Sequence, residues 1–163
     1  MKIIILRGLP GTGKTIIAKI LKDIFFNSEI ISVDKLKIQA LKSKYTFLKA
    51  NKIGFEISMQ ELSKLSKTKE VIILEEIICN KKFYHELNNF IKDTECESYW
   101  FRITRKLNHL LAVESKRKRK IKNTKKDFLN LKKEIEMIEI KSEHKIKNDD
   151  LEKTIKEILD ILI

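Results

Sequence analysis

The chemistry of this chain is concentrated in one glycine-rich octapeptide, Gly8-Leu9-Pro10-Gly11-Thr12-Gly13-Lys14-Thr15, which satisfies the pattern G-x-x-x-x-G-K-[ST] in full. Glycines let backbone N–H groups converge on a phosphate oxygen, and the N-terminus of a following helix adds positive potential. In such a loop Lys14 bridges the β- and γ-phosphates and the Thr15 hydroxyl holds Mg²⁺. The predicted nucleotide-binding residues are Gly8, Leu9, Pro10, Gly11, Thr12, Gly13, Lys14, Thr15 and Ile16.

Buried strands and amphipathic helices must hold this loop in place. Residues 2–7 predict a short buried strand, because β-branched residues run unbroken and glycines follow at once. A helix is expected from about residue 14 to 26, because its large apolar residues share one face. Further strands are expected at 30–33, 71–74, 98–103 and 137–140. Further helices are expected within 35–69 (broken near 51–54), at 83–91, from 104, at 125–136 with Thr124 as N-cap, and after a cap at 148–150.

Strands that alternate with helices favour parallel pairing, so the expected architecture is a three-layer α/β fold. The chain has 163 residues, of which 42% are hydrophobic, and no internal linker is evident. We therefore expect a single domain over residues 1–163. No apolar run approaches the ~20 residues of a membrane helix, and the apolar start is too short for a signal peptide. A cytoplasmic protein without a membrane partner is predicted.

The basic residues are unevenly distributed along the chain. The formal net charge is +12, and residues 102–133 contain thirteen Lys or Arg against two acidic residues. The rest of the chain is nearly neutral, with 22 basic and 21 acidic residues. Such an excess in one segment indicates a polyanionic ligand there.

Acidic side chains follow two of the expected strands. Asp34 ends the second strand, and Glu75 and Glu76 end the third. In open parallel sheets, ligands bind beyond the carboxyl ends of the strands. These carboxylates are therefore expected beside the glycine-rich loop.

The sequence resembles the small P-loop kinases, which include polynucleotide kinases, the zeta-toxin-like group and adenylate-kinase-type enzymes. The resemblance covers the glycine loop, the Asp-ended second strand, the acidic third strand, a basic segment after the fourth strand and a closing strand and helix. It implies a five-stranded parallel sheet in the order 2-3-1-4-5 with a basic helical lid at about residues 104–126. Only the glycine loop is a specific motif in itself.

The resemblance also implies roles for individual residues. Asp34 matches the carboxylate that takes the proton of the acceptor hydroxyl, and Lys37 lies where such kinases often have an acceptor-binding Arg. Glu75 matches the carboxylate that binds Mg²⁺ through water, although Asp is commoner there, and Glu76 is its alternative. The competing interpretations are a helix cap for Asp34, a solvated helix residue for Lys37 and a solvated strand end for the glutamates.

In related kinases, lid arginines close over ATP and neutralise charge on the transferred phosphoryl group. Arg117 and Arg119 are the candidates, because Arg holds phosphate bidentately. The alternative is that residues 116–120 form a solvated charged face.

GTP is a poor fit, because Asn51-Lys52-Ile53-Gly54 and Asn80-Lys81-Lys82-Phe83 both lack the Asp of N-K-x-D. The predicted function is an ATP- and Mg²⁺-dependent phosphotransferase that acts on a hydroxyl. A polynucleotide 5′-hydroxyl is the favoured acceptor, with single-stranded nucleic acid at the basic lid. Two alternatives stay open: a small-molecule or nucleotide kinase, and a non-catalytic ATP-binding nucleic-acid module.

Overall fold

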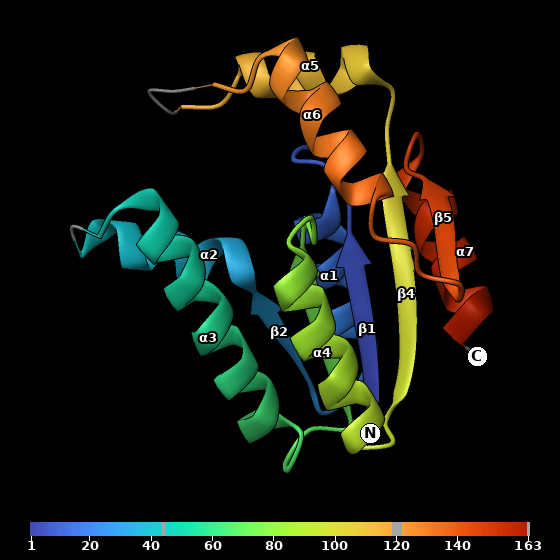
Figure 1. Cartoon of the computed structure of the whole chain (residues 1–163). Coiled ribbons are helices and arrows are strands. Elements are labelled where there is room, and N and C mark those ends of the chain that lie inside the picture. Colours follow the sequence, from blue (N-terminus) through green and yellow to red (C-terminus); the bar gives the residue numbers. More distant parts are fainter. Residues whose placement is uncertain (44, 119–121, 163) are drawn as a thin grey trace.

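The computed structural model describes residues 1–43, 45–118 and 122–162. Strands and helices alternate along most of the chain (Figure 1). The strands are β1 (Lys2–Arg7), β2 (Ser28–Ser32), β3 (Val71–Glu76), β4 (Glu97–Thr104) and β5 (Glu143–Lys147). The helices are α1 (Lys14–Ile24), α2 (Val33–Lys42), α3 (Phe47–Leu65), α4 (Lys81–Asp93), α5 (Leu107–Ser115), α6 (Lys125–Glu136) and α7 (Leu151–Leu162).

The five strands form one parallel sheet in the order β2-β3-β1-β4-β5, which confirms the predicted topology. The central strand β1 pairs with β3 and β4, so that Arg7 lies level with Glu76 on one side and Arg102 on the other. Because all strands run in the same direction, their carboxyl ends meet at one edge. The glycine-rich loop begins at that edge, directly after β1.

Successive residues of the strands supply two separate cores, which makes three layers. Ile3 and Ile5 of β1 face a cluster with residues from α3 and α4, whereas Ile4 and Leu6 face a cluster with residues from α1 and α7. All four side chains are fully buried. Helices α5 and α6 lie together beyond the carboxyl edge of the sheet (Figure 1).

The predicted break in the helical region 35–69 was placed wrongly. The chain breaks between α2 and α3, around residues 43–46, and continues as helix through residues 51–54. Thr46 caps α3 by accepting a hydrogen bond from the Lys49 N–H at 3.3 Å. Gly54 of α3 lies at a contact with α2, because a Cβ at this position would lie 2.5 Å from Lys37 Cγ. The glycine therefore lets α2 and α3 approach each other.

The fifth strand was also placed wrongly, at residues 137–140 instead of Glu143–Lys147. Ile138 packs in the core just after α6, and a turn closes where the Glu143 N–H donates to Ile140 O at 3.1 Å. The observed strand has one buried apolar residue, Ile146. It is an edge strand held by charged side chains, which hydrophobic periodicity does not detect.

Smaller shifts affect two other elements. Strand β2 ends at Ser32, so Asp34 lies in the first turn of α2 instead of at the strand end. The basic helix begins at Leu107, three residues after the expected Thr104. Across the described residues, the helices are too short or too polar to cross a lipid bilayer.

Candidate nucleotide-binding site

The glycine-rich loop adopts the backbone that its glycines permit. Gly8, Gly11 and Gly13 have φ values of 146°, 87° and 97°, which L-residues rarely adopt. Side chains would also collide, since a Cβ on Gly8 would lie 2.3 Å from Ile103 O. Both constraints specify glycine, and the loop leads directly into α1 at Lys14.

Lys14 lies inside the loop with only 8% of its surface exposed. Its Nζ donates to the carbonyl oxygens of Gly8 at 2.7 Å and Leu9 at 3.1 Å. Burial lowers the pKa of Lys14, while Asp34 and the two glutamates oppose that shift. A dianionic or trianionic phosphate at the loop would favour the charged ammonium, because opposite charges nearby raise an amine's pKa.

Thr15 and Glu75 meet beside the loop. The Thr15 hydroxyl donates to Glu75 Oε2 at 2.7 Å, although the two residues come from α1 and β3. Hydroxyl and carboxylate oxygens are ligands that Mg²⁺ prefers, and Mg²⁺ usually completes its octahedron with water and phosphate oxygens. The pair therefore fits the predicted metal role. Among the described residues no cluster of three His, Cys, Asp or Glu side chains is suited to a metal.

Asp34, Lys37 and Glu76 form a second group at the same edge of the sheet. Lys37 Nζ lies 2.7 Å from Glu76 Oε1 and 3.9 Å from Asp34 Oδ1. The same ammonium sits 4.3 Å above the ring centre of Phe55. Asp34 keeps 53% of its side chain exposed, and Ser32 occupies the N-cap position of α2. Asp34 is therefore not the residue that caps this helix.

Glu76 is almost fully buried, with 2% exposure. Glu75 contacts Thr15 whereas Glu76 contacts Lys37, as expected for neighbours on a strand, whose side chains point to opposite faces. Burial raises the pKa of Glu76 to about 7, with Asp34 adding to the shift and Lys37 opposing it. Glu76 Oε2 has no hydrogen-bond partner within the described parts of the chain. The sequence predicts Glu76 only as an alternative to Glu75 at the metal. Its contact is with Lys37 instead of Thr15, so it belongs to a different group of side chains.

Asn148, which sequence reasoning assigned to a helix cap, instead holds the glycine-rich loop. Its side-chain N–H donates to Thr12 O at 2.7 Å, and its Oδ1 accepts from the Thr154 hydroxyl at 3.2 Å. A Cβ on Gly13 would lie 2.4 Å from Asn148 Nδ2. The segment between β5 and α7 thus packs directly on the loop. The sequence carried no signal for this long-range contact.

Helix α5 of the predicted lid packs against the loop. A Cβ on Gly11 would meet side-chain atoms of Leu110 and Val113 at 3.5 Å. Arg117 follows this helix; its Nη1 lies 3.2 Å from Glu114 Oε2, and its charge helps to lower the pKa of Lys14. The structure therefore brings Arg117 near the loop. Arg119, the other predicted lid arginine, lies outside the described residues.

A buried ionic cluster lies under the lid. Glu143 Oε1 is 3.1 Å from Arg7 Nε, and Glu143 Oε2 is 2.6 Å from Arg102 Nη2. Arg7 is fully buried and also donates to the carbonyl oxygens of Ile138 and Ile135 at the end of α6. The cluster joins β1, β4 and β5 and anchors α6. The prediction overlooked it because the three charges are far apart in the sequence.

Several solved structures share the whole fold at low sequence identity. A tunicamycin resistance protein from Deinococcus radiodurans is 17% identical, with a TM-score of 0.74 and coverage of 99% of this chain and 95% of its own. A putative kinase from Chloroflexus aurantiacus is 11% identical, with a TM-score of 0.72 and coverage of 98% and 97%. The APS kinase CysC from Mycobacterium tuberculosis, solved with AMPPNP and APS, is 14% identical, with a TM-score of 0.65 and coverage of 99% and 96%.

Comparison with curated proteins gives no match. The sequence profile described as "Chromatin associated protein KTI12" matches residues 1–139. That range includes the glycine-rich loop, Asp34 after β2, Glu75 and Glu76 at the end of β3, and helices α5 and α6. The fold and the loop are those of small P-loop kinases, and the chain belongs to the KTI12 family.

Proposed function

We propose that this protein is an ATP- and Mg²⁺-dependent phosphotransferase that moves the γ-phosphoryl group of ATP to a hydroxyl. One observation carries the proposal: Lys14, the Thr15–Glu75 pair and the Asp34–Lys37–Glu76 group gather at one edge of the sheet around the glycine-rich loop. Phosphoryl transfer depends mainly on positioning and on charge stabilisation, and this group supplies both.

Each residue then has a role that its chemistry allows. Lys14 and the loop N–H groups hold the phosphates, and Thr15 with Glu75 would hold Mg²⁺, which screens the phosphate charge. The acceptor oxygen forms a bond to the γ-phosphorus while the bond to the β–γ bridging oxygen breaks, and ADP leaves. Asp34 orients the acceptor hydroxyl and takes its proton. Lys37, which is held by its ion pair with Glu76, binds the acceptor substrate.

For the acceptor we favour the 5′-hydroxyl of a single-stranded polynucleotide. The charge excess of residues 102–133 exceeds what the phosphates of one nucleotide require. In the described part of this segment, Lys116, Lys118, Lys122, Lys125 and Lys126 are exposed. Lys122 also donates to Ser115 O, and the exposed ammonium groups can contact a phosphate backbone.

The test is one incubation with γ-labelled ATP, Mg²⁺ and a panel of hydroxyl-ended oligonucleotides, nucleosides and nucleotides. We expect label to appear on the oligonucleotides. Label only on a nucleoside or nucleotide would identify a small-molecule kinase. Binding of both ATP and oligonucleotide without any transfer would identify a non-catalytic nucleic-acid module.

Oligonucleotide binding should depend steeply on salt. If about four to six cations contact phosphates, log K should fall against log salt with a slope of roughly −3 to −4, at −0.7 per contact for a single strand. Replacing Lys116, Lys118 and Lys122 together by Glu should flatten that slope and weaken binding. Fluorescence anisotropy across a salt series measures both. A slope near zero for the unaltered protein would favour a small-molecule acceptor.

Arg117→Ala should lower kcat more than it weakens ATP binding, because a lid arginine acts on charge that develops in the transition state. The expected fall in kcat is about 10²–10³-fold. Steady-state kinetics with an ATP-affinity measurement separates the two effects. Lys64→Ala, which removes an exposed cation from the last turn of α3, is the control. Equal kcat for Arg117→Ala and the unaltered protein would show that residues 116–118 form a solvated face.

A further inference from the structure

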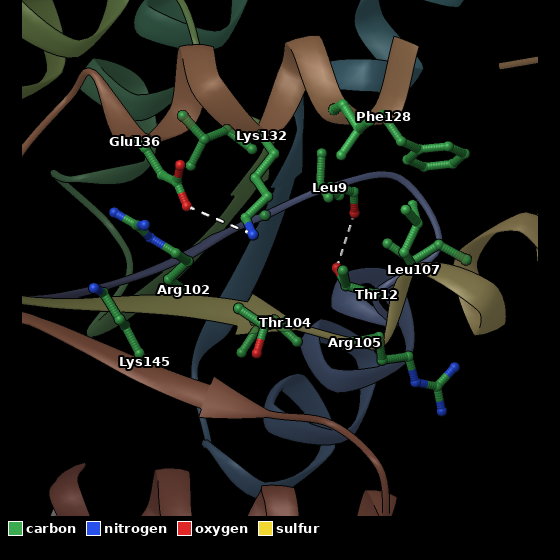
Figure 2. Close-up of a pocket in the computed structure, with 15 residues that line it drawn as sticks. Leu9, Thr12, Arg102, Thr104, Arg105, Leu107, Phe128, Lys132, Glu136 and Lys145 are labelled. Atoms are coloured by element: carbon green, nitrogen blue, oxygen red, sulfur yellow. Dashed lines mark hydrogen bonds and ion pairs between the residues drawn. The ribbon is translucent and has the colours of Figure 1, made fainter. Parts of the chain in front are cut away.

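A cavity of about 340 Å³ opens between α6 and the carboxyl ends of β4 and β5 (Figure 2). This volume lies in the range of small-molecule pockets. Gly8, Leu9 and Thr12 of the glycine-rich loop form one of its walls. The cavity therefore adjoins the nucleotide-binding site, but Asp34, Lys37, Glu75 and Glu76 do not line it.

One part of the cavity wall is apolar. It is formed by Leu107 and Leu110 from α5 and by Phe128, Leu129 and Ile135 from α6. Figure 2 shows Leu107 and Phe128 beside Leu9, near the end of the cavity closest to the loop. Leu129 keeps 42% exposure, so its side chain is accessible from the cavity mouth. Such a wall favours the flat apolar face of a ring.

Another part of the wall is cationic. The cavity is lined by four basic side chains, Arg102, Arg105, Lys132 and Lys145, and by one acidic side chain, Glu136. Lys132 pairs with Glu136 only at 3.9 Å on an exposed helix face, so this pairing is weak. Lys145 is exposed and lines the cavity from β5. The lining therefore has a net positive charge.

The buried ionic cluster of Arg7, Arg102 and Glu143 adds to the positive charge beside the cavity. Two arginines, Arg7 and Arg102, share the single carboxylate of Glu143, which leaves one positive charge uncompensated beside the cavity. Glu143 is 3% exposed and Arg7 is fully buried, so water screens this charge poorly. An anionic group at the cavity mouth would be attracted to it.

We propose that the cavity holds one nucleotide unit of a single-stranded polynucleotide. The base lies against Leu107 and Leu129, with the buried ring of Phe128 beneath them, and its phosphate lies at Lys132 and Lys145. Proteins that bind single strands combine these two features, an apolar or aromatic surface for bases and cations along the backbone. The inference rests on the proposed polynucleotide acceptor, and it adds a defined base-binding position outside the glycine-rich loop.

The experiment measures equilibrium binding of a short single-stranded DNA that ends in a 5′-hydroxyl. An abasic nucleotide is placed at each position in turn, with a non-hydrolysable ATP analogue and Mg²⁺ at saturation. We expect one position at which the missing base weakens binding about fivefold, the lower end of the range for a base–aromatic contact, because the Phe128 ring is only 1% exposed. Other positions should change little, because abasic nucleotides keep the phosphate.

Three variants locate that position on the protein. Leu129→Ala removes apolar surface at an exposed site, so it should reduce the effect of the missing base without unfolding the chain. Lys132→Glu should weaken binding of every oligonucleotide. Lys156→Glu makes the same charge change on α7, which covers the other face of the sheet, and should leave binding nearly unchanged.

Equal binding of all abasic strands would overturn the inference, as would equal effects of Lys132→Glu and Lys156→Glu. A loss of ATP-analogue affinity in Lys132→Glu would assign the cavity to ATP and also overturn it. The proposed function is tested separately by transfer of label from ATP. A base-dependent position without transfer would support the cavity assignment and contradict the kinase, whereas transfer without such a position would do the reverse.

Discussion

Lys14→Ala is expected to abolish detectable phosphoryl transfer while leaving the fold intact. Loss of one preorganised charged donor costs about 10²–10³-fold in rate. In its proposed role Lys14 also holds the phosphates in position, so a fall of about 10³-fold or more is expected. The side chain is buried as a charge, and burial lowers its pKa. Its removal relieves that burial while losing two hydrogen bonds to loop carbonyls. The melting temperature without nucleotide should therefore shift little.

The measurement is label transfer from ATP together with a thermal melt of the same preparation. Lys64→Ala is the control, because Lys64 is exposed in the last turn of α3. It should retain full activity. Near-normal turnover by Lys14→Ala would refute the phosphate-binding role of this lysine. Loss of activity accompanied by a large fall in melting temperature would instead indicate a structural role.

Asp34→Asn is expected to lower kcat by about 10²–10⁴-fold, the range for a positioned proton acceptor. The amide keeps the size of the carboxylate but cannot accept the proton. ATP affinity should change little, because the proposed role of Asp34 is toward the acceptor and its recorded ion pair is with Lys37. Stability should also change little, because the side chain is half exposed and is not the N-cap of α2.

Steady-state kinetics with saturating acceptor, combined with ATP titration, distinguishes the possible roles of Asp34. Asp93→Asn, at the end of α4, is the matched control for a lost surface carboxylate. Normal kcat with weaker ATP binding would place Asp34 on the nucleotide side. Normal kcat with lower stability would mean that its charge serves only the first turn of α2.

Most of the fold could be predicted because the buried strands are continuous apolar runs. β1 and β3 are flanked by glycine or acidic residues, and the helices between them have clear apolar faces. Hydrophobic periodicity does not detect a strand that is held in the sheet by charged side chains. β5 is a polar edge strand held by Glu143 between two arginines, whereas the apolar residues at 137–140 lie in a turn. The sequence predicts a helix break near Gly54, but this glycine instead lies at a close contact between α2 and α3.

The site could be predicted where its residues are contiguous or follow a strand directly. The loop, Thr15 and Glu75 belong to that class, and the structure brings them together. The ion pair of Lys37 with Glu76 joins residues of α2 and β3, and the bond of Asn148 to Thr12 joins residues 136 positions apart. Neither contact leaves a local pattern in the sequence. Both contacts arise because the sheet brings segments that are far apart in the sequence next to one another.

The bond between Asn148 and the glycine-rich loop has a consequence for chain cleavage. The residues matched by the family profile end at 139, before β5, Asn148 and α7. A protease cut between 139 and 143 that released the C-terminal piece would leave Thr12 O without its buried donor and Arg7 without its carboxylate. Resistance of that turn to limited proteolysis therefore reports on the integrity of the phosphate site, although the turn itself contacts no phosphate.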